Sequence, residues 1–148
     1  MRLYHYATWA GEAIQKSGVI LPNINYANWV KHTLLTRWPD LVFLTQNEYW
    51  EPSIQSVNKQ GLWEKCGSYP ETYAALGIPC WKFEVNLNTL VLGMVDRLSE
   101  EYPRWDFMLQ DAEKMGSHTE DWRVTSQDCY VINTWKWEND EWMIPTNE

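Results

Sequence analysis

The first hydrophobic pattern in the chain is an alternation over residues 2–7. Because successive side chains of a β-strand point to opposite faces of a sheet, this alternation predicts a strand. One face would carry Leu3, His5 and Ala7, and the other face would carry Tyr4 and Tyr6. The predicted strand therefore separates an imidazole from two phenol rings.

A short helix is predicted directly after this strand, over residues 9–16. Thr8 is suited to cap its N-terminus, and small and aliphatic side chains recur at helical spacing. Gly18 stands where a left-handed residue commonly ends a helix. The apolar residues 19–21 then predict a short extended segment.

The middle of the chain predicts two more strands and a long loop. The apolar run of residues 41–45 predicts a buried strand, and the alternation of residues 81–85 predicts a half-buried one. Residues 46–69 lack a sustained period, which indicates a long loop of the kind that covers a site. Residues 71–76 predict a helical turn that ends at Gly77.

The C-terminal third predicts a helix followed by a hairpin. Residues 103–114 have a helical pattern, with a proline near the first turn and a glycine after the end. Two β-prone runs, 129–137 and 141–144, are separated by Asn139-Asp140. Such a pair favours a tight turn, so the two runs predict a β-hairpin.

Two segments give no clear pattern. For residues 26–35 the sequence predicts either a helix or an ordered loop. For residues 90–92 it predicts either a short strand or the approach to a helix. Elsewhere the helices lie in the first and middle parts of the chain, while strands recur throughout. This order predicts an α+β fold with a split, mainly antiparallel β-sheet and short flanking helices, built by residues 1–148 as one domain.

Aromatic residues are unusually frequent, since the 148 residues include 11 Trp and 8 Tyr. Most of these rings are expected in the core, but aromatic faces also stack on ligand rings. No apolar run approaches the ~20 residues of a membrane span, and no leader peptide is recognised. The cysteines and histidines lack metal-ligand spacing. We therefore expect a cytoplasmic protein that binds neither a metal nor a membrane.

Charge is distributed unevenly around a net charge of −8. Residues 1–37 contain four basic residues and one acidic residue, whereas residues 96–148 contain five basic and thirteen acidic residues. Proteins that bind a long duplex normally present a basic face, so this distribution argues against binding to long duplex DNA. The basic N-terminal part suits a small anionic ligand such as a dinucleotide. The simpler alternative is that the acidic charge serves solubility.

Two short segments combine an apolar strand with polar and aromatic side chains. We call residues 3–8 the first cassette and residues 41–53 the second cassette. In the first cassette, His5 can exchange hydrogen bonds with a ribose hydroxyl group, and Tyr6 adds a ring face and a phenol group. The alternative for His5 is an ordinary core position on a strand.

The second cassette ends in side chains suited to hold a planar ring. Thr45 ends the predicted strand, and Tyr49 and Trp50 follow a turn. Stacking on either ring would hold a planar cation such as nicotinamide. The alternative is that both rings only cover the edge of the sheet. The neighbouring Glu48 and Glu51 would either orient a hydroxyl group or be solvated loop charges.

The order of these segments resembles the N-terminal half of the ADP-ribosyltransferase-like fold. The resemblance rests on Leu-Tyr-His-Tyr-x-Thr at residues 3–8, Ser-Gly-Val-Ile at residues 17–20, and Phe-Leu-Thr with Tyr-Trp-Glu-Pro-Ser at residues 43–53. It is nearest the His-Tyr-Glu branch, which includes poly-ADP-ribosyl transferases, RNA 2′-phosphotransferases and DarT-type toxins. Beyond residue 53 the resemblance is one of general strand order.

The resemblance implies NAD as the substrate and assigns roles to the cassette residues. His5 would hydrogen-bond the ribose of NAD. Tyr49, with Trp50 as the competing choice, would stack on nicotinamide. Thr45 would occupy the small hydroxyl position at the end of its strand.

The third motif of this branch is a glutamate at the start of a late strand. It bonds the nicotinamide ribose and stabilises the positive charge that develops as the glycosidic bond breaks. The matching position in this chain is Asp128, or Gln127 if the register shifts by one. Aspartate is one methylene shorter than glutamate and glutamine carries no charge, so the third motif departs from the family pattern.

The resemblance therefore implies a protein that binds NAD and transfers or hydrolyses ADP-ribose. The acceptor would be a protein, a tRNA end or a free nucleotide. The variant third motif leaves a second function open, a catalytically degenerate module that binds a nucleotide or ADP-ribose. The small size and negative charge leave a third, a small acidic inhibitor protein of a phage or mobile element that acts by surface mimicry.

Overall fold

The computed structural model describes residues 2–22, 42–52, 56–57, 63–64, 69–86, 93–94 and 105–145. Its helices are α1 (Gly11–Ser17), α3 (Pro70–Ala75) and α5 (Trp105–Lys114), with a 3₁₀ helix at Thr119–Asp121. Its strands are β1 (Tyr4–Ala7), β2 (Val19–Ile20), β3 (Val42–Thr45), β4 (Ser56–Val57), β5 (Trp63–Glu64), β6 (Trp81–Val85), β7 (Gly93–Met94), β8 (Trp122–Thr125), β9 (Cys129–Glu138) and β10 (Glu141–Met143). None of the described helices is long and apolar enough to cross a membrane. The predictions for residues 26–35 and 90–92 lie outside the described residues.

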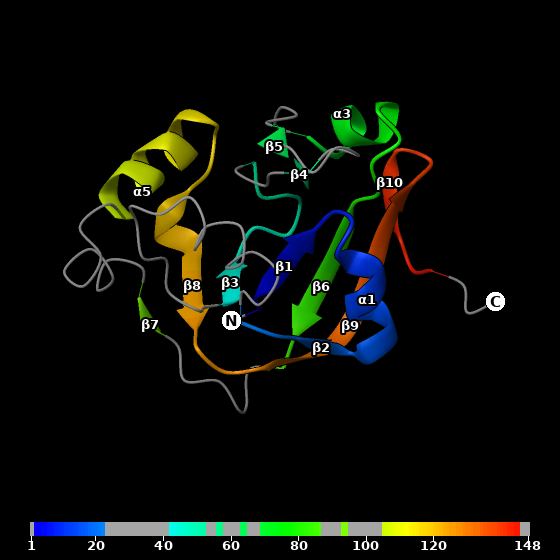
Figure 1. The fold of residues 1–148 in the computed structure, drawn as a ribbon, viewed down its shortest axis with the longest axis horizontal. Helices are drawn as coiled ribbons and strands as arrows, with labels where there is room; N and C mark the ends of the chain where they lie inside the picture. The colour runs from blue at the N-terminus through cyan, green and yellow to red at the C-terminus, as the bar shows by residue number, and fades with distance from the viewer. Residues whose placement is uncertain are drawn as a thin grey trace.

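Most strands belong to one sheet with the order β10-β9-β6-β1-β3-β8-β7, and β2 pairs with β9. The strands β4 and β5 form a separate two-stranded ladder. In Figure 1 the large sheet extends from β7 and β8 on the left to β9 and β10 on the right, and α1 lies against β6. The prediction of an α+β fold with a mainly antiparallel sheet and short helices is confirmed.

The two faces of β1 contribute to two different cores, as the alternation predicts. One face contributes to what we call the first core, whose buried members are Leu3, Ala7, Ile20, Val42, Leu44, Trp81, Phe83, Val85 and Cys129. The other face contributes to the aromatic core, whose buried members are Tyr4, Tyr6, Trp50, Tyr73, Ile78, Cys80 and Trp137. Since β1 lies between β3 and β6, it connects both cores at the centre of the sheet.

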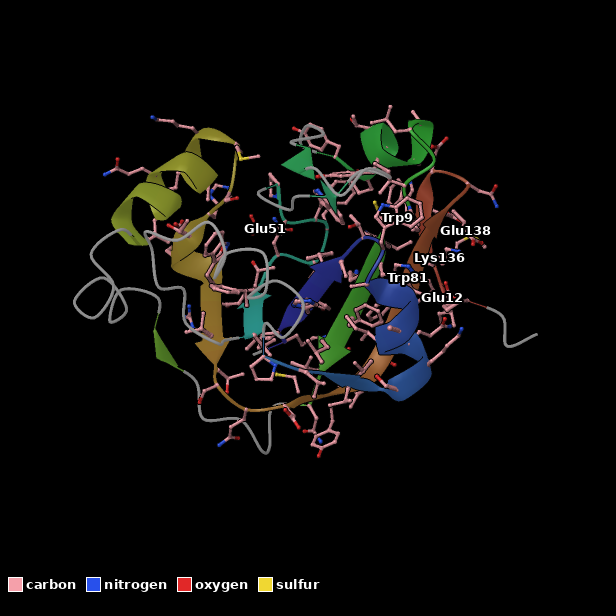
Figure 2. All side chains as sticks on the ribbon, viewed as in Figure 1. Trp9, Glu12, Glu51, Trp81, Lys136 and Glu138 are labelled. Atoms are coloured by element: carbon pink, nitrogen blue, oxygen red, sulfur yellow. The ribbon has the colours of Figure 1, made fainter. Side chains whose placement is uncertain are left out.

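The helix predicted over residues 9–16 begins later than expected. It starts at Gly11, and the residue before it has no side-chain cap, so the expected cap by Thr8 is wrong. A Cβ atom at Gly11 would lie 2.1 Å from the Trp81 ring, so only glycine allows the first turn to rest against this indole. Lys136 Nζ lies over the same ring, 5.1 Å from its centroid (Figure 2). The predicted left-handed end at Gly18 is confirmed by its φ of 72°.

The strand β6 is buried along all five residues, although its sequence predicts a half-buried strand. It pairs with β1 on one side and β9 on the other, so neither of its hydrogen-bonding edges is open. Its residues Trp81, Phe83 and Val85 belong to the first core, and Cys80, directly before the strand, belongs to the aromatic core. The predicted loop over residues 46–69 also contains the β4–β5 ladder, which its sequence pattern does not predict.

The predicted C-terminal hairpin is confirmed. β9 and β10 pair with Glu141 opposite Glu138, and the two turn residues between them have left-handed backbones. Their φ angles are 54° for Asn139 and 60° for Asp140. Asn and Asp tolerate this conformation better than other non-glycine residues, which explains why this dipeptide forms the turn.

Candidate functional site

His5 lies at the centre of β1 on the side of the first core, since it alternates with Tyr4 and Tyr6 of the aromatic core. The imidazole is half-buried, and its Nδ1 lies 2.8 Å from the carbonyl oxygen of Phe43. A carbonyl oxygen only accepts hydrogen bonds, so Nδ1 must be the donor. Burial lowers the pKa of His5 below 6.5, which keeps the ring neutral at pH 7. The Nε2 atom of this tautomer is an acceptor, as a ribose hydroxyl group requires.

Tyr6 and Trp50 lie on the opposite side of the sheet. The Tyr6 hydroxyl donates to the carbonyl oxygen of Asn47 at 2.5 Å, and its ring centroid lies 5.2 Å from that of Trp50. Burial raises the pKa of Tyr6. Trp50 is only 1 % exposed. Both rings are therefore members of the aromatic core, and Trp50 presents no open face to a ligand.

Thr45 and Tyr49 lie on this side as well. Thr45 pairs with Tyr4, so the two side chains share a face, and its Oγ1 accepts from the amide of Asn47 at 3.2 Å. Tyr49 is 46 % exposed, and its ring contacts that of Trp137 edge-on with centroids 6.1 Å apart. A hydrogen bond to Glu71, at 2.5 Å, raises the pKa of Tyr49 to about 12. Of the two candidate stacking rings, Tyr49 is the accessible one.

The structure thus brings four of the predicted site residues to one side of the sheet and places His5 on the other. The four are Tyr6, Thr45, Tyr49 and Trp50. The sheet itself separates His5 from both candidate stacking rings. A single ligand touches His5 and Tyr49 only if it extends around the end of β3.

Asp128 and Gln127 lie in the exposed turn between β8 and β9. The antiparallel register of β3 and β8 pairs Val42 with Thr125, so this turn follows the end of β8 that adjoins the beginning of β3. The second cassette turns away at the other end of β3, at Thr45. The structure therefore does not bring Asp128 or Gln127 together with the ring-bearing part of the second cassette.

Asp121 lies at the end of the sheet where the second cassette turns. Thr45 pairs with Trp122, and the amide of Gln46 donates to the carbonyl oxygen of Asp121 at 3.1 Å, which extends the ladder by one residue. Asp121 is the half-buried last residue of the 3₁₀ helix that precedes β8, so it lies at the end of β8 beside the turn of the second cassette.

The sequence contains a signal for Asp121 that our prediction missed. The acidic pair Glu120-Asp121 directly precedes the β-prone run that forms β8, but we sought the third motif before the next strand, β9. Both positions are acidic residues before a strand. Only the pairing of β8 with β3 distinguishes them, and strand pairing cannot be read from local sequence.

His5 of β1 and Asp121, which directly precedes β8, place a neutral imidazole and a carboxylate two strands apart, with β3 between them. Such a pair can accept a hydrogen bond from a hydroxyl group and stabilise a nearby positive charge. Among the described residues, no group of three or more His, Cys, Asp or Glu is arranged to hold a metal ion. Comparisons of the chain with protein-family models, with curated proteins and with solved structures find no match.

Proposed function

We propose that this chain is an ADP-ribosyltransferase-like protein that binds NAD and transfers or hydrolyses ADP-ribose. One observation carries the proposal: His5 lies on β1 and Asp121 directly precedes β8, and only β3 separates these two strands. The motif order in the sequence agrees with this arrangement, because β1, β3 and β8 follow in that order along the chain. The third-motif role is thereby assigned to Asp121 in preference to Asp128 or Gln127.

In this proposal His5 binds and Asp121 stabilises charge. His5 Nε2 accepts a hydrogen bond from a ribose hydroxyl group of NAD. The glycosidic bond between ribose C1′ and the nicotinamide nitrogen breaks, and its electron pair leaves with nicotinamide. The carboxylate of Asp121 stabilises the positive charge left on the ribose. Water or an acceptor nucleophile then bonds to C1′ and loses a proton.

Tyr49 is the ring that we assign to nicotinamide stacking, because Trp50 is buried in the aromatic core. This assignment requires NAD to extend around the end of β3, so it is tested separately from His5 and Asp121. The acceptor stays open among a protein, a tRNA end and a free nucleotide.

The second candidate function is a binding module that holds a nucleotide or ADP-ribose without turnover. The chemistry of Asp121 favours it, because an aspartate reaches one methylene less far than the glutamate of the His-Tyr-Glu branch. Substitution Asp121→Glu separates the two functions. Turnover that appears only in this variant would identify a degenerate binding module.

The test is titration with NAD, followed by tryptophan fluorescence, together with an assay of nicotinamide release. We expect binding and release by the wild-type protein. Release should fall about 100-fold or more in Asp121→Asn, comparable to the loss of one charge-stabilising group in other enzymes. Asp128→Asn, the matched control, should release nicotinamide at the wild-type rate. Absence of binding at millimolar NAD would contradict the proposal, and salt-sensitive binding to a basic protein instead would favour the inhibitor hypothesis.

A further inference from the structure

Glu51 is a buried carboxylate at the end of the second cassette. One oxygen accepts a hydrogen bond from the hydroxyl of Ser117, and the other accepts from Trp122 Nε1 at 2.7 Å. All three side chains are buried. Figure 2 shows Glu51 near the beginning of β8. A buried charge is costly unless it is hydrogen-bonded, so this carboxylate depends on its donors and in turn fixes where they lie.

The two donors bracket the segment that carries Asp121. Ser117 precedes the segment and Trp122 follows it, so the two oxygens of Glu51 hold both of its ends. Pro52, the next residue of the second cassette, lies beside the same segment. A Cβ atom at Gly116 would lie 3.8 Å from the ring of Pro52. The end of the second cassette therefore packs against residues 116–122.

Contacts within the segment transmit this restraint to Asp121. Its amide donates to the carbonyl oxygen of His118 at 2.9 Å, and its carbonyl oxygen accepts from Gln46 at 3.1 Å. The guanidinium of Arg123 donates to the carbonyl oxygen of Glu120 at 3.0 Å. The backbone on both sides of Asp121 is thus fixed, and a shift at either end of the segment would move its carboxylate.

We propose that Glu51 is a positioning residue, which sets the place of the Asp121 carboxylate at the start of β8. This inference rests on the proposed function, since it requires that Asp121 act on the ligand. The positioning depends on both carboxylate oxygens of Glu51. Glutamine at this position keeps one acceptor for Trp122 and offers its amide to the Ser117 oxygen, so it preserves the shape of the contact and loses one charged acceptor.

A purely structural role for Glu51 makes a different prediction from a positioning role. If Glu51 only stabilised the fold, its loss would lower the melting temperature and leave the kcat of the folded protein unchanged. A positioning residue changes the geometry of the reacting group, and small misplacements of such a group lower kcat strongly. The ratio of kcat to ligand affinity therefore separates the two roles.

The experiment compares Glu51→Gln with wild type and with Glu138→Gln, a matched change at an exposed carboxylate on β9. Nicotinamide release gives kcat, calorimetry gives the Kd for ADP-ribose, and circular dichroism gives the melting temperature. For Glu51→Gln we expect kcat to fall about 10- to 100-fold, with the Kd for ADP-ribose within about twofold of wild type. Ser117→Ala, which removes one donor, should lower kcat in the same direction by less.

The outcomes separate this inference from the proposed function. If wild type releases nicotinamide and both Glu51→Gln and Ser117→Ala release it at the same rate, the positioning role is overturned and the proposed function stands. A fall in kcat that merely follows the folded fraction of each variant also overturns it. If wild type binds no ADP-ribose and releases no nicotinamide, both proposals fail together.

Discussion

The two sides of β1 differ in how their polar groups are used. On the side of the aromatic core, rings contact one another, and the Tyr6 hydroxyl bonds the backbone of the second cassette. On the side of the first core, the half-buried His5 retains an acceptor atom, and Asp121 precedes β8, two strands away. The abundance of tryptophan thus builds mainly a core, while the ligand chemistry that we propose uses the less aromatic side.

Lys82 shows how completely the aromatic side is filled. Its ammonium lies 5.1 Å from the ring centroid of Tyr4, 4.5 Å from that of Trp135 and 5.7 Å from that of Trp142. It also donates to the carbonyl oxygen of Glu48 at 2.7 Å. The three rings that could surround a cationic ligand therefore surround a lysine of the chain itself.

The largest loss of stability on either side of β1 should come from removing a ring of the aromatic core. Trp50→Ala should destabilise the fold by about 3–5 kcal/mol, because it leaves a cavity among packed rings. Tyr49→Phe should cost only about 0.5–1.5 kcal/mol, since it removes one hydrogen bond at an exposed site. Denaturation in urea measures both. Equal effects of the two substitutions would contradict the different placement of these neighbouring rings.

On the other side of the sheet, Gly11→Ala should destabilise the fold by about 1–3 kcal/mol. The new methyl group would overlap the buried Trp81 ring, which Lys136 covers as well. Thermal unfolding measures this effect. Gly18→Ala is the comparison, because Gly18 has open space around it and its cost comes only from the left-handed backbone. A smaller effect at Gly11 than at Gly18 would show that α1 is not held against β6 in this way.

Lys82 should make the stability of the aromatic side depend on pH. Burial lowers the pKa of Lys82 in the folded state below its ordinary value of 10.5. Between the lowered pKa of the folded state and 10.5, the unfolded chain binds more protons than the folded chain. The stability of the fold should therefore rise as the pH increases through this range. Lys82→Met should remove this rise while keeping most of the buried volume. Urea denaturation across the alkaline range checks the slope, and an unchanged slope in the methionine variant would contradict the prediction.

His5 should produce the smallest effect, at acidic pH. Burial lowers its pKa below 6.5, so the unfolded chain binds the extra proton first as the pH falls. Stability should therefore decrease as the pH decreases below 6.5, and His5→Gln should lose this part of the pH dependence. NMR titration of the imidazole gives the pKa directly. A pKa of His5 above 6.5 would contradict the burial of its imidazole.

Local features of this fold were predictable from sequence, and non-local ones were not. The alternation of β1, the left-handed Gly18 and the Asn139-Asp140 turn depend on a few neighbouring residues each. The need for glycine at the start of α1 depends instead on Trp81, which lies seventy positions away in the chain. A pattern within ten residues carries no information about such a contact.

The candidate site divides in the same way. The resemblance implied His5 and a late acidic residue as site positions, and both stay predictions. It did not indicate Asp121, whose relation to the second cassette arises from the pairing of β8 with β3. The burial of Glu51 was equally hidden, since its donors Ser117 and Trp122 are separated from it by 66 and 71 positions.

The central claim is that one ligand contacts both His5 and Asp121. A crystal structure of the protein with ADP-ribose tests this most directly. We expect a ribose hydroxyl group within hydrogen-bond distance of His5 Nε2 and the ligand extending across β3 toward the Asp121 carboxylate. ADP-ribose bound only against Tyr49 on the aromatic side, with His5 and Asp121 untouched, would contradict the account.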